Sequence, residues 1–242
     1  MSHFDNETAF ESLCPLYDSF DNSRQASAPI FRRKLFGRFF TAAGLAVSGV
    51  AISSVLGGKA QAQSGVRTTL SQQMKSVQRH ESAHVAFLVN TLGTAARPKP
   101  TFQNIKAPNL SAFLGLARAL ENVGVGAYLG AAPAILSRPI LAAAGSIATI
   151  ESRHAGFFNS LQSVAVTQNA FGDEQSFERP FTAAEVVSFA GPYVASLNGG
   201  PALTYDAMVP SAANDIQILN FALALEYLEA EYYDMNVPTF YP

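Results

Sequence analysis

The chain has 242 residues, of which 48% are hydrophobic and only 14% are charged, and its formal net charge is −2 at pH 7. That length supplies one sizeable core and hardly a second, so a single domain is expected. The small negative charge offers no basic surface to a phosphate backbone, which excludes nucleic acid as an expected partner.

The first part of the chain, residues 1–62, has the pattern of an export leader. Arg32 and Arg33 precede an apolar stretch over 39–56, and Ala60-Gln-Ala62 offers a small-x-small cleavage site. The arginine pair resembles a twin-arginine signal, which exports folded proteins; an ordinary secretory leader stays open as the alternative. We expect a periplasmic or extracellular protein without stable membrane association, or a membrane-anchored one if the leader is not cleaved, because the apolar stretch of about 18 residues is at the lower limit of a bilayer span.

The remainder, residues 63–242, is predicted to form one domain of the all-α class. Helical periodicity recurs in four segments and none alternates with a period of two; the segments are about 68–92, 110–130, 138–161 and 213–236. Gly93 ends the first, Asn109 caps the second, and Ser137 caps the third with Pro139 in its first turn. Pro238 is predicted to close the fourth. The one cysteine, Cys14, precedes the predicted cleavage site, so the mature fold depends on packing alone or on packing plus metal.

The links between the helices predict their directions. The link between the first two has roughly 16 residues and can stretch about 50 Å, longer than a helix of about 25 residues, so it can cross the bundle and leave those helices parallel. The short link after the second helix makes the next pair antiparallel. A long connection precedes the fourth helix and contains one short helix, indicated by the capping box Thr182-Ala-Ala-Glu185.

Two of the helices carry the same Glu-x-x-His motif on their apolar face. In the first, Glu81 and His84 lie between Val77 and Leu88 in the 4-3-4 spacing of one helical face. In the third, Glu151 and His154 continue the apolar stripe in the same way. Both pairs are therefore expected to point into the core.

The other two helices each bring a glutamate with a tyrosine seven residues later. These pairs are Glu121 with Tyr128 and Glu226 with Tyr233. Glu229 is on the same face as Glu226 and is either a further ligand or a hydrogen-bonding partner of one. The tyrosines are either ordinary core aromatics or hydrogen-bond donors to the glutamates.

Four carboxylates in one core require neutralisation, because burying an isolated carboxylate is strongly unfavourable. Two divalent cations would balance them, with the imidazoles as neutral ligands. One Glu on each of two helices and Glu-x-x-His on the other two is the ligand set of di-iron and di-manganese carboxylate bundles. The predicted ligands are Glu81, His84, Glu121, Glu151, His154 and Glu226. The residues do not choose between iron and manganese, and His80 is expected at the surface.

Four strings resemble the bacterial ferritin-like proteins related to plant desiccation-associated proteins. They are His80-Glu-Ser-Ala-His84-Val-Ala-Phe-Leu88, Glu121-Asn-Val-Gly-Val-Gly-Ala-Tyr128, Ile150-Glu-Ser-Arg-His154-Ala and Ile218-Leu-Asn-Phe-Ala-Leu-Ala-Leu-Glu-Tyr-Leu-Glu-Ala-Glu-Tyr-Tyr233. The resemblance implies a ferritin-like four-helix bundle. It also implies a circular permutation, because in that family the helix similar to 213–236 comes first.

The expected function is redox chemistry on dioxygen or peroxide at a two-metal centre, as an oxidase, ferroxidase or catalase-like protein. Two alternatives stay open: a metal-sequestering or stress-protective bundle without turnover, and a structural bundle whose acids are satisfied by hydrogen bonds and water. We expect a monomer or a small homo-oligomer, in which the last helix packs in its own chain or is swapped into a neighbour.

Overall fold

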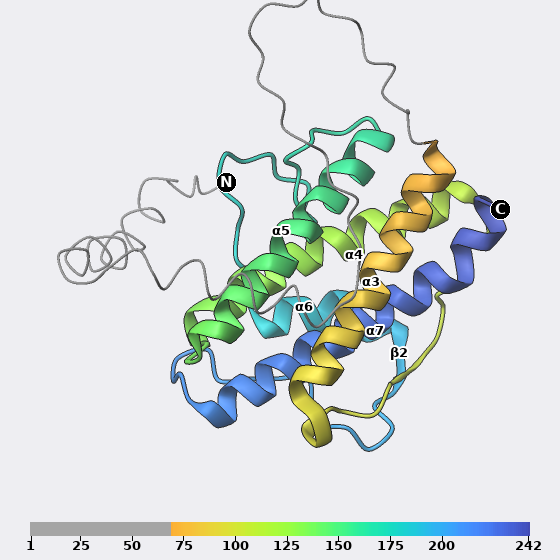
Figure 1. Cartoon of the computed structure of the whole chain (residues 1–242). Helices are drawn as coiled ribbons and strands as arrows, with labels where there is room; N and C mark the ends of the chain where they lie inside the picture. The colour runs from red at the N-terminus through yellow and green to blue at the C-terminus, as the bar shows by residue number, and fades with distance from the viewer. Residues whose placement is uncertain (1–68) are drawn as a thin grey trace, which may run out of the picture. The chain divides into compact units, whose positions relative to one another are not determined.

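The computed structural model describes residues 69–242. The predicted leader, with Arg32, Arg33 and the cleavage site at Ala60 to Ala62, lies outside the described residues. The described part is built from four long helices, α3, α4, α5 and α7, and a short one, α6 (Figure 1). Their bounds are Leu70–Leu92, Leu110–Ala131, Arg138–Leu161, Ala212–Phe240 and, for α6, Ala183–Ala190. The predicted all-α bundle is confirmed.

Most of the predicted helix ends are confirmed by capping contacts. The side chain of Asn109 accepts a hydrogen bond from the Ala112 N–H at the start of α4. Thr182 and Glu185 form the predicted capping box of α6. Gly93 ends α3 with φ at 55°, a left-handed conformation that glycine adopts without strain.

One predicted helix end is confirmed without its capping contact, and another differs from the structure. Ser137 is the N-cap residue of α5, as predicted, but its hydroxyl makes no capping hydrogen bond within residues 69–242; the Asp215 carboxylate accepts hydrogen bonds from the backbone N–H groups of Leu136 and Ser137. Pro238 does not close α7, which continues to Phe240. Proline removes one backbone hydrogen bond near the helix end, and the burial of Val237 in the core holds that last turn in place.

The helix directions follow from contacts between their ends. At the start of α3, the Ser71 hydroxyl contacts the Tyr241 carbonyl beyond α7, so these two helices are antiparallel. The Tyr232 hydroxyl donates to the Phe113 carbonyl, and Asn214 at the other end of α7 donates to Ala134, so α4 is also antiparallel to α7. Consequently α3 and α4 are parallel, as the link length predicts. Contacts of Arg118 with Asn159 and of Gln162 with Leu114 make α4 and α5 antiparallel.

The link between α3 and α4 makes hydrogen bonds with the connection that precedes α7. Two short strands, β1 (Thr101–Phe102) and β2 (Val194–Ser196), pair in antiparallel fashion. Arg97 in the same link donates to the carbonyls of Asn220 and Pro201. These contacts fix the crossover along α7.

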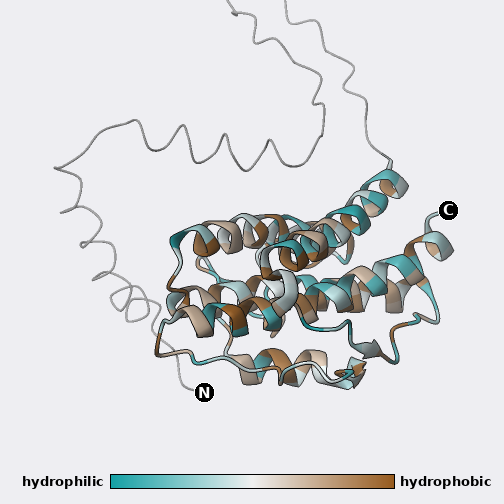
Figure 2. Ribbon diagram, turned by 60° about the horizontal axis from the view of Figure 1, so that its bottom comes forward, coloured by the Kyte–Doolittle hydropathy of each residue, from teal (hydrophilic) through white to brown (hydrophobic). Residues whose placement is uncertain are grey.

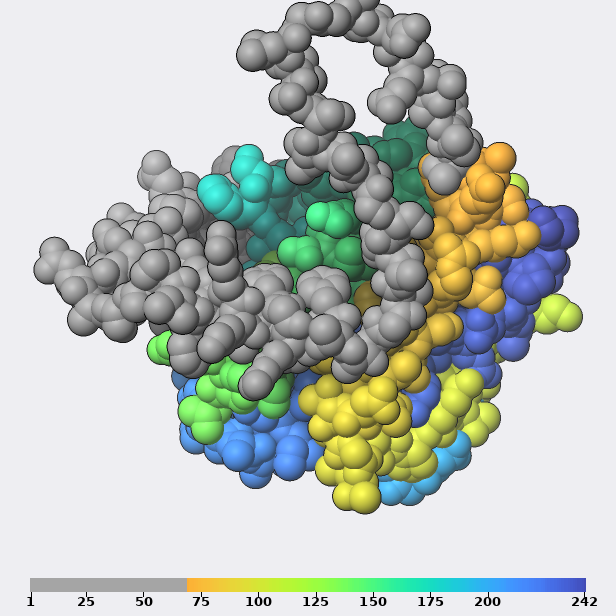
Figure 3. Space-filling model, viewed as in Figure 1, coloured from red at the N-terminus to blue at the C-terminus, as the bar shows by residue number. Residues whose placement is uncertain are grey.

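The fourth long helix packs on helices of its own chain. α3 packs chiefly on α7 and α5 chiefly on α4, while α4 and α7 also meet. The space-filling view shows atoms of α3 and α7 side by side (Figure 3). Hydrophilic and apolar residues are mixed along the bundle (Figure 2), and in α4 and α7 the middle turns are buried on all sides. None of the helices within residues 69–242 combines the length and apolar composition of a membrane span.

The core consists of two apolar clusters with a polar layer between them. The first contains Leu88 of α3 and Ile147 of α5, and the second contains Val77 of α3 and Phe158 of α5. The Glu-x-x-His pairs of α3 and α5 fall between these positions in the sequence. The helices therefore bring their buried acids to one level of the bundle, insulated by apolar side chains at both ends.

Candidate metal centre

All six predicted ligands lie together in the polar layer. Glu81, Glu121 and Glu151 are 0% exposed, and Glu226 is 1% exposed. His84 and His154 are also buried. Each long helix contributes at least one member, so the site depends on the whole bundle.

The donor atoms of these residues form two groups that share two members. One group contains Glu121 and His154, the other contains Glu226 and His84, and both contain Glu81 and Glu151; within each group the donor atoms are within 4.8 Å of one another. The glutamates of the two Glu-x-x-His motifs therefore lie between the groups. Each group adds one imidazole and one further carboxylate.

The distances inside each group suit a metal better than a hydrogen-bond network. His84 Nδ1 lies 3.1 Å from Glu81 Oε2, 3.1 Å from Glu151 Oε1 and 3.2 Å from Glu226 Oε2. One ring N–H cannot donate to three carboxylates at once. Ligand atoms at right angles around a cation with bonds of roughly 2.1 Å are about 3 Å apart, which matches this spacing.

The second group has the same spacing. His154 Nδ1 lies 3.0 Å from Glu81 Oε1 and 3.0 Å from Glu121 Oε2. Glu81 therefore places one oxygen beside each imidazole. The Glu81 carboxylate thus connects the two groups.

Three carboxylate oxygens at the centre lack hydrogen-bond partners among the residues that the structure describes. They are Glu81 Oε1 and both oxygens of Glu151. The nearby imidazole nitrogens are close enough, but these contacts do not have hydrogen-bond geometry. Buried polar atoms are normally satisfied, and unpaired ones call for a ligand such as an ion. The Glu and His residues present thus fit bound metal.

The charges in the layer perturb the pKa values of its members. Burial alone would lower the pKa values of His84 and His154, but neighbouring carboxylates raise both, that of His154 to about 11. Burial would raise the pKa of Glu81, yet the two imidazoles lower it to about 2. Burial raises the pKa of Glu226 to about 7, and burial together with Glu81 raises that of Glu151 well above its ordinary value. Without cations, the layer is therefore balanced by bound protons.

Tyr128 and Tyr233 contact the two glutamates that belong to a single group. The Tyr128 hydroxyl donates to Glu226 Oε1 at 2.6 Å, and the Tyr233 hydroxyl donates to Glu121 Oε1. In each glutamate the other oxygen, Oε2, faces an imidazole. The interpretation of the tyrosines as donors to the glutamates agrees with these contacts.

Glu229 is buried in the same layer but belongs to neither group of donor atoms. Burial and the nearby carboxylates, Glu151 first among them, raise its pKa well above the ordinary value. A protonated carboxyl at this place adds no negative charge. Its position beside the centre fits the expected role of a partner better than that of a ligand.

His80 has a contact that sequence reasoning missed. It is exposed, as predicted, but its Nδ1 lies 2.9 Å from Nε2 of His154, and the two rings are within 4° of parallel. Ligand histidines usually donate their second ring N–H to a partner that fixes the ring. In the sequence, His80 directly precedes the Glu-x-x-His motif of α3. Nothing in that position indicates a contact with α5.

Gly124 leaves room for the carboxylate of Glu151. A Cβ atom at this position would lie 2.9 Å from Glu151 Oε2. Gly115, also in α4, has open space around the corresponding position. The two glycines are therefore a matched pair for testing whether Glu151 must keep its place.

We expect Gly124→Ala to weaken metal binding and Gly115→Ala to leave it unchanged. Alanine in a helix interior usually raises stability by roughly 0.5–1 kcal/mol relative to glycine, so the fold should tolerate both changes. Titration calorimetry with Mn²⁺ and thermal unfolding measure the two effects separately. Equal affinities in the two variants would show that the position of Glu151 is unimportant for binding.

A comparison with protein families agrees with this architecture. The model of the ferritin-like domain family matches residues 37–163, just over half of the chain. The match includes α3, α4 and α5 and ends before α7. No curated protein and no solved structure gave a significant match. On the strength of the family match and of the buried Glu and His layer inside a four-helix bundle, the chain belongs to the ferritin-like domain family.

Proposed function

We propose that this protein binds two iron or manganese ions in the polar layer and performs redox chemistry on dioxygen or peroxide. The observation that carries the proposal is the set of unpaired oxygens of Glu81 and Glu151 between two imidazoles. Iron and manganese accept this combination of carboxylate oxygen and imidazole nitrogen. They would supply one-electron steps at the centre.

The residues of each group would hold one ion. Glu121 and His154 would bind the first and Glu226 and His84 the second, with Glu81 and Glu151 shared. The negative charge of four carboxylates equals the positive charge of two divalent ions. This balance supports two ions rather than one.

The surrounding residues would orient the ligands. Tyr128 and Tyr233 hold one oxygen of Glu226 and of Glu121, which turns the other oxygen toward the imidazole. With Nδ1 of His154 directed at the carboxylates, its Nε2–H is free to donate to Nδ1 of His80. Apolar clusters on both sides exclude water from the layer, which strengthens the electrostatic interactions inside it.

We also propose that α7 replaces the helix that comes first in related bacterial ferritin-like proteins, as the resemblance to the desiccation-associated family implies. Glu226 comes from α7, beyond the end of the family match, yet its carboxylate reaches the same group as Glu81 and His84. The site needs four helices in space and not in a fixed order along the chain. An export leader over residues 1–62, and hence a periplasmic or extracellular location, completes the proposal.

The test is metal loading followed by oxidation. The protein is loaded anaerobically with Fe²⁺ or Mn²⁺, and the metal content is measured by elemental analysis, with about two ions per chain expected from the ligand set. Crystals of the loaded protein should give anomalous peaks in both groups of ligands. Exposure to dioxygen or hydrogen peroxide should then produce ferric absorption faster than in free Fe²⁺.

Two outcomes would contradict parts of the proposal. Protein that retains no metal would favour a structural bundle in which the acids hold protons. Metal without turnover on either oxidant would favour a metal-sequestering or stress-protective role.

A further inference from the structure

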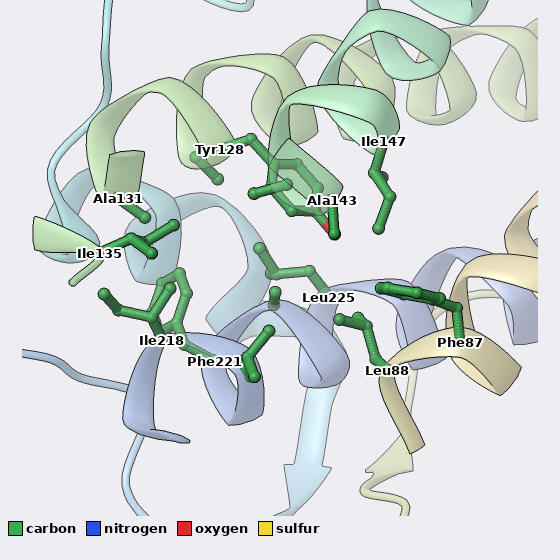
Figure 4. A pocket seen from close by; sticks show the side chains of 14 residues that line it. Phe87, Leu88, Tyr128, Ala131, Ile135, Ala143, Ile147, Ile218, Phe221 and Leu225 are labelled. Atoms are coloured by element: carbon green, nitrogen blue, oxygen red, sulfur yellow. The ribbon is translucent and has the colours of Figure 1, made fainter. Parts of the chain in front are cut away.

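An apolar cavity lies at one end of the polar layer, among α3, α4, α5 and α7. Its wall contains Leu88, Tyr128, Ile147 and Ala222, with almost no polar surface (Figure 4). Its space amounts to about 480 Å³ with the open mouth included. The enclosed part has room for about one or two water-sized molecules.

The cavity lies one helical turn from the candidate ligands. Leu88 follows His84 by four residues, Ile147 precedes Glu151 by four, and Ala222 precedes Glu226 by four. Four residues of helix correspond to about 6 Å along the axis. Tyr128 connects the two places directly, because its ring lines the cavity and its hydroxyl donates to Glu226.

Part of the cavity wall is formed by partly buried residues. Phe87, Ala143 and Leu225 are half-buried, whereas Leu88, Ile147 and Ala222 are buried. Phe87 belongs to α3 and Ala143 to α5, the two long helices that pack chiefly on other partners. The apolar lining therefore extends from partly buried residues of α3 and α5 to residues one helical turn from the polar layer.

We infer that this cavity is the binding and entry site of dioxygen and that it discriminates against hydrogen peroxide. Apolar cavities of this kind stay dry and take up nonpolar molecules such as xenon. Hydrogen peroxide would lose its hydrogen bonds to water and find almost no polar partner in the wall, so its entry is unfavourable. The inference rests on the proposed function in naming dioxygen as the oxidant, but the cavity itself does not depend on bound metal.

Xenon binding tests the cavity independently of metal. Crystals of the metal-free protein, placed under xenon pressure, should show an anomalous peak among Leu88, Ile147 and Ala222. The absence of a peak there would overturn the inference even if the protein binds iron. If xenon binds in the cavity but the protein retains no iron, the proposed function is overturned instead.

A pair of alanine variants tests the route. Ala144 lines the cavity, whereas Ala148, one turn along α5, is half-buried on the same core and does not line it. In iron-loaded protein, Ala144→Leu should reduce kcat/KM for dioxygen by at least about tenfold, because leucine adds three carbon atoms and a single extra methylene in an apolar pocket already has an effect of about that size. Oxidation by hydrogen peroxide should be unchanged in this variant, and Ala148→Leu should affect neither oxidant.

Two results would overturn the route. One is an equal loss with both oxidants in Ala144→Leu, and the other is no loss with dioxygen. If Ala144→Leu does not fold, Ala222→Val fills the same cavity from α7 and is measured in its place.

Discussion

Replacing Glu81 and Glu151 together by glutamine should abolish metal binding, whereas replacing Glu151 alone should leave the metal-free fold as stable as before, or more stable. These two carboxylates are shared by both groups of donor atoms, so their loss removes charge from both ions. Even a change in a partner of a metal ligand weakens binding 10–100-fold, and loss of both shared ligands should exceed about a hundredfold.

In the metal-free protein, Glu151→Gln alone should leave stability unchanged or higher, because neither oxygen of Glu151 has a hydrogen-bond partner within residues 69–242 and burial raises its pKa well above the ordinary value. Removing such a buried carboxylate relieves an unfavourable charge, and glutamine has nearly the same volume. Glu81 differs, because its Oε2 lies 3.1 Å from Nδ1 of His84 and the imidazoles lower its pKa to about 2, so its loss should destabilise the metal-free fold. Chemical denaturation without metal should therefore show an unchanged or higher free energy of unfolding for Glu151→Gln. A structural role for Glu151 predicts the opposite, a large loss of stability without metal.

Glu231→Gln is the matched control for this experiment. Glu231 is also on a long helix, but its carboxylate is partly exposed and pairs with Lys99 at the surface. Such pairs contribute on the order of 0–1 kcal/mol, so both metal affinity and stability should stay near the wild-type values. The double variant and the control would be compared by titration calorimetry with Mn²⁺. Wild-type affinity in the double variant would contradict the assigned ligand set.

The metal centre was predictable from the sequence because it depends on helical periodicity. The spacing of Glu81 and His84 relative to Val77 and Leu88 fixes the face on which they lie, and the same holds for Glu151 and His154 in α5. The length of the link between α3 and α4 permits these helices to be parallel, as the structure has them. The approximate level of each acid follows, since every helix crosses the bundle from one end to the other.

The features that sequence reasoning missed depend on contacts between distant residues. The pairing of β1 with β2 joins two short segments without strand periodicity, and the contact of His80 with His154 depends on how closely α3 approaches α5. Ser137 has the side chain of a helix cap, but its hydroxyl makes no capping hydrogen bond within residues 69–242. The backbone N–H groups at this helix start donate to Asp215 of α7 instead. In these cases tertiary packing, which a local pattern does not contain, decides the outcome.

Metal affinity should rise steeply with pH. Coordination requires neutral imidazoles, whereas neighbouring carboxylates raise the pKa of His154 to about 11 and also raise that of His84. Both rings are therefore protonated near pH 7 without metal, and each proton released adds about a factor of ten in affinity per pH unit. Two histidine protons give about a hundredfold per pH unit, and Glu226, with a pKa of about 7, adds to the slope below pH 7.

The stability of the metal-free protein should change in the opposite direction between pH 6 and pH 8. Histidines whose pKa values are raised by folding stabilise the fold fully at a pH below 6.5, their pKa in the unfolded chain. This contribution is lost as the pH rises toward their pKa values in the folded protein. Protonated Glu226 likewise stabilises the fold fully at a pH below 4.5, its pKa in the unfolded chain, and its contribution is lost as the pH rises through about 7. The melting temperature without metal should therefore fall from pH 6 to pH 8, while saturating Mn²⁺ should produce a larger rise at pH 8 than at pH 6. Calorimetry in buffers of different ionisation enthalpy counts the protons released. Metal binding without proton release would mean that the carboxylates and imidazoles of this layer are not the ligands.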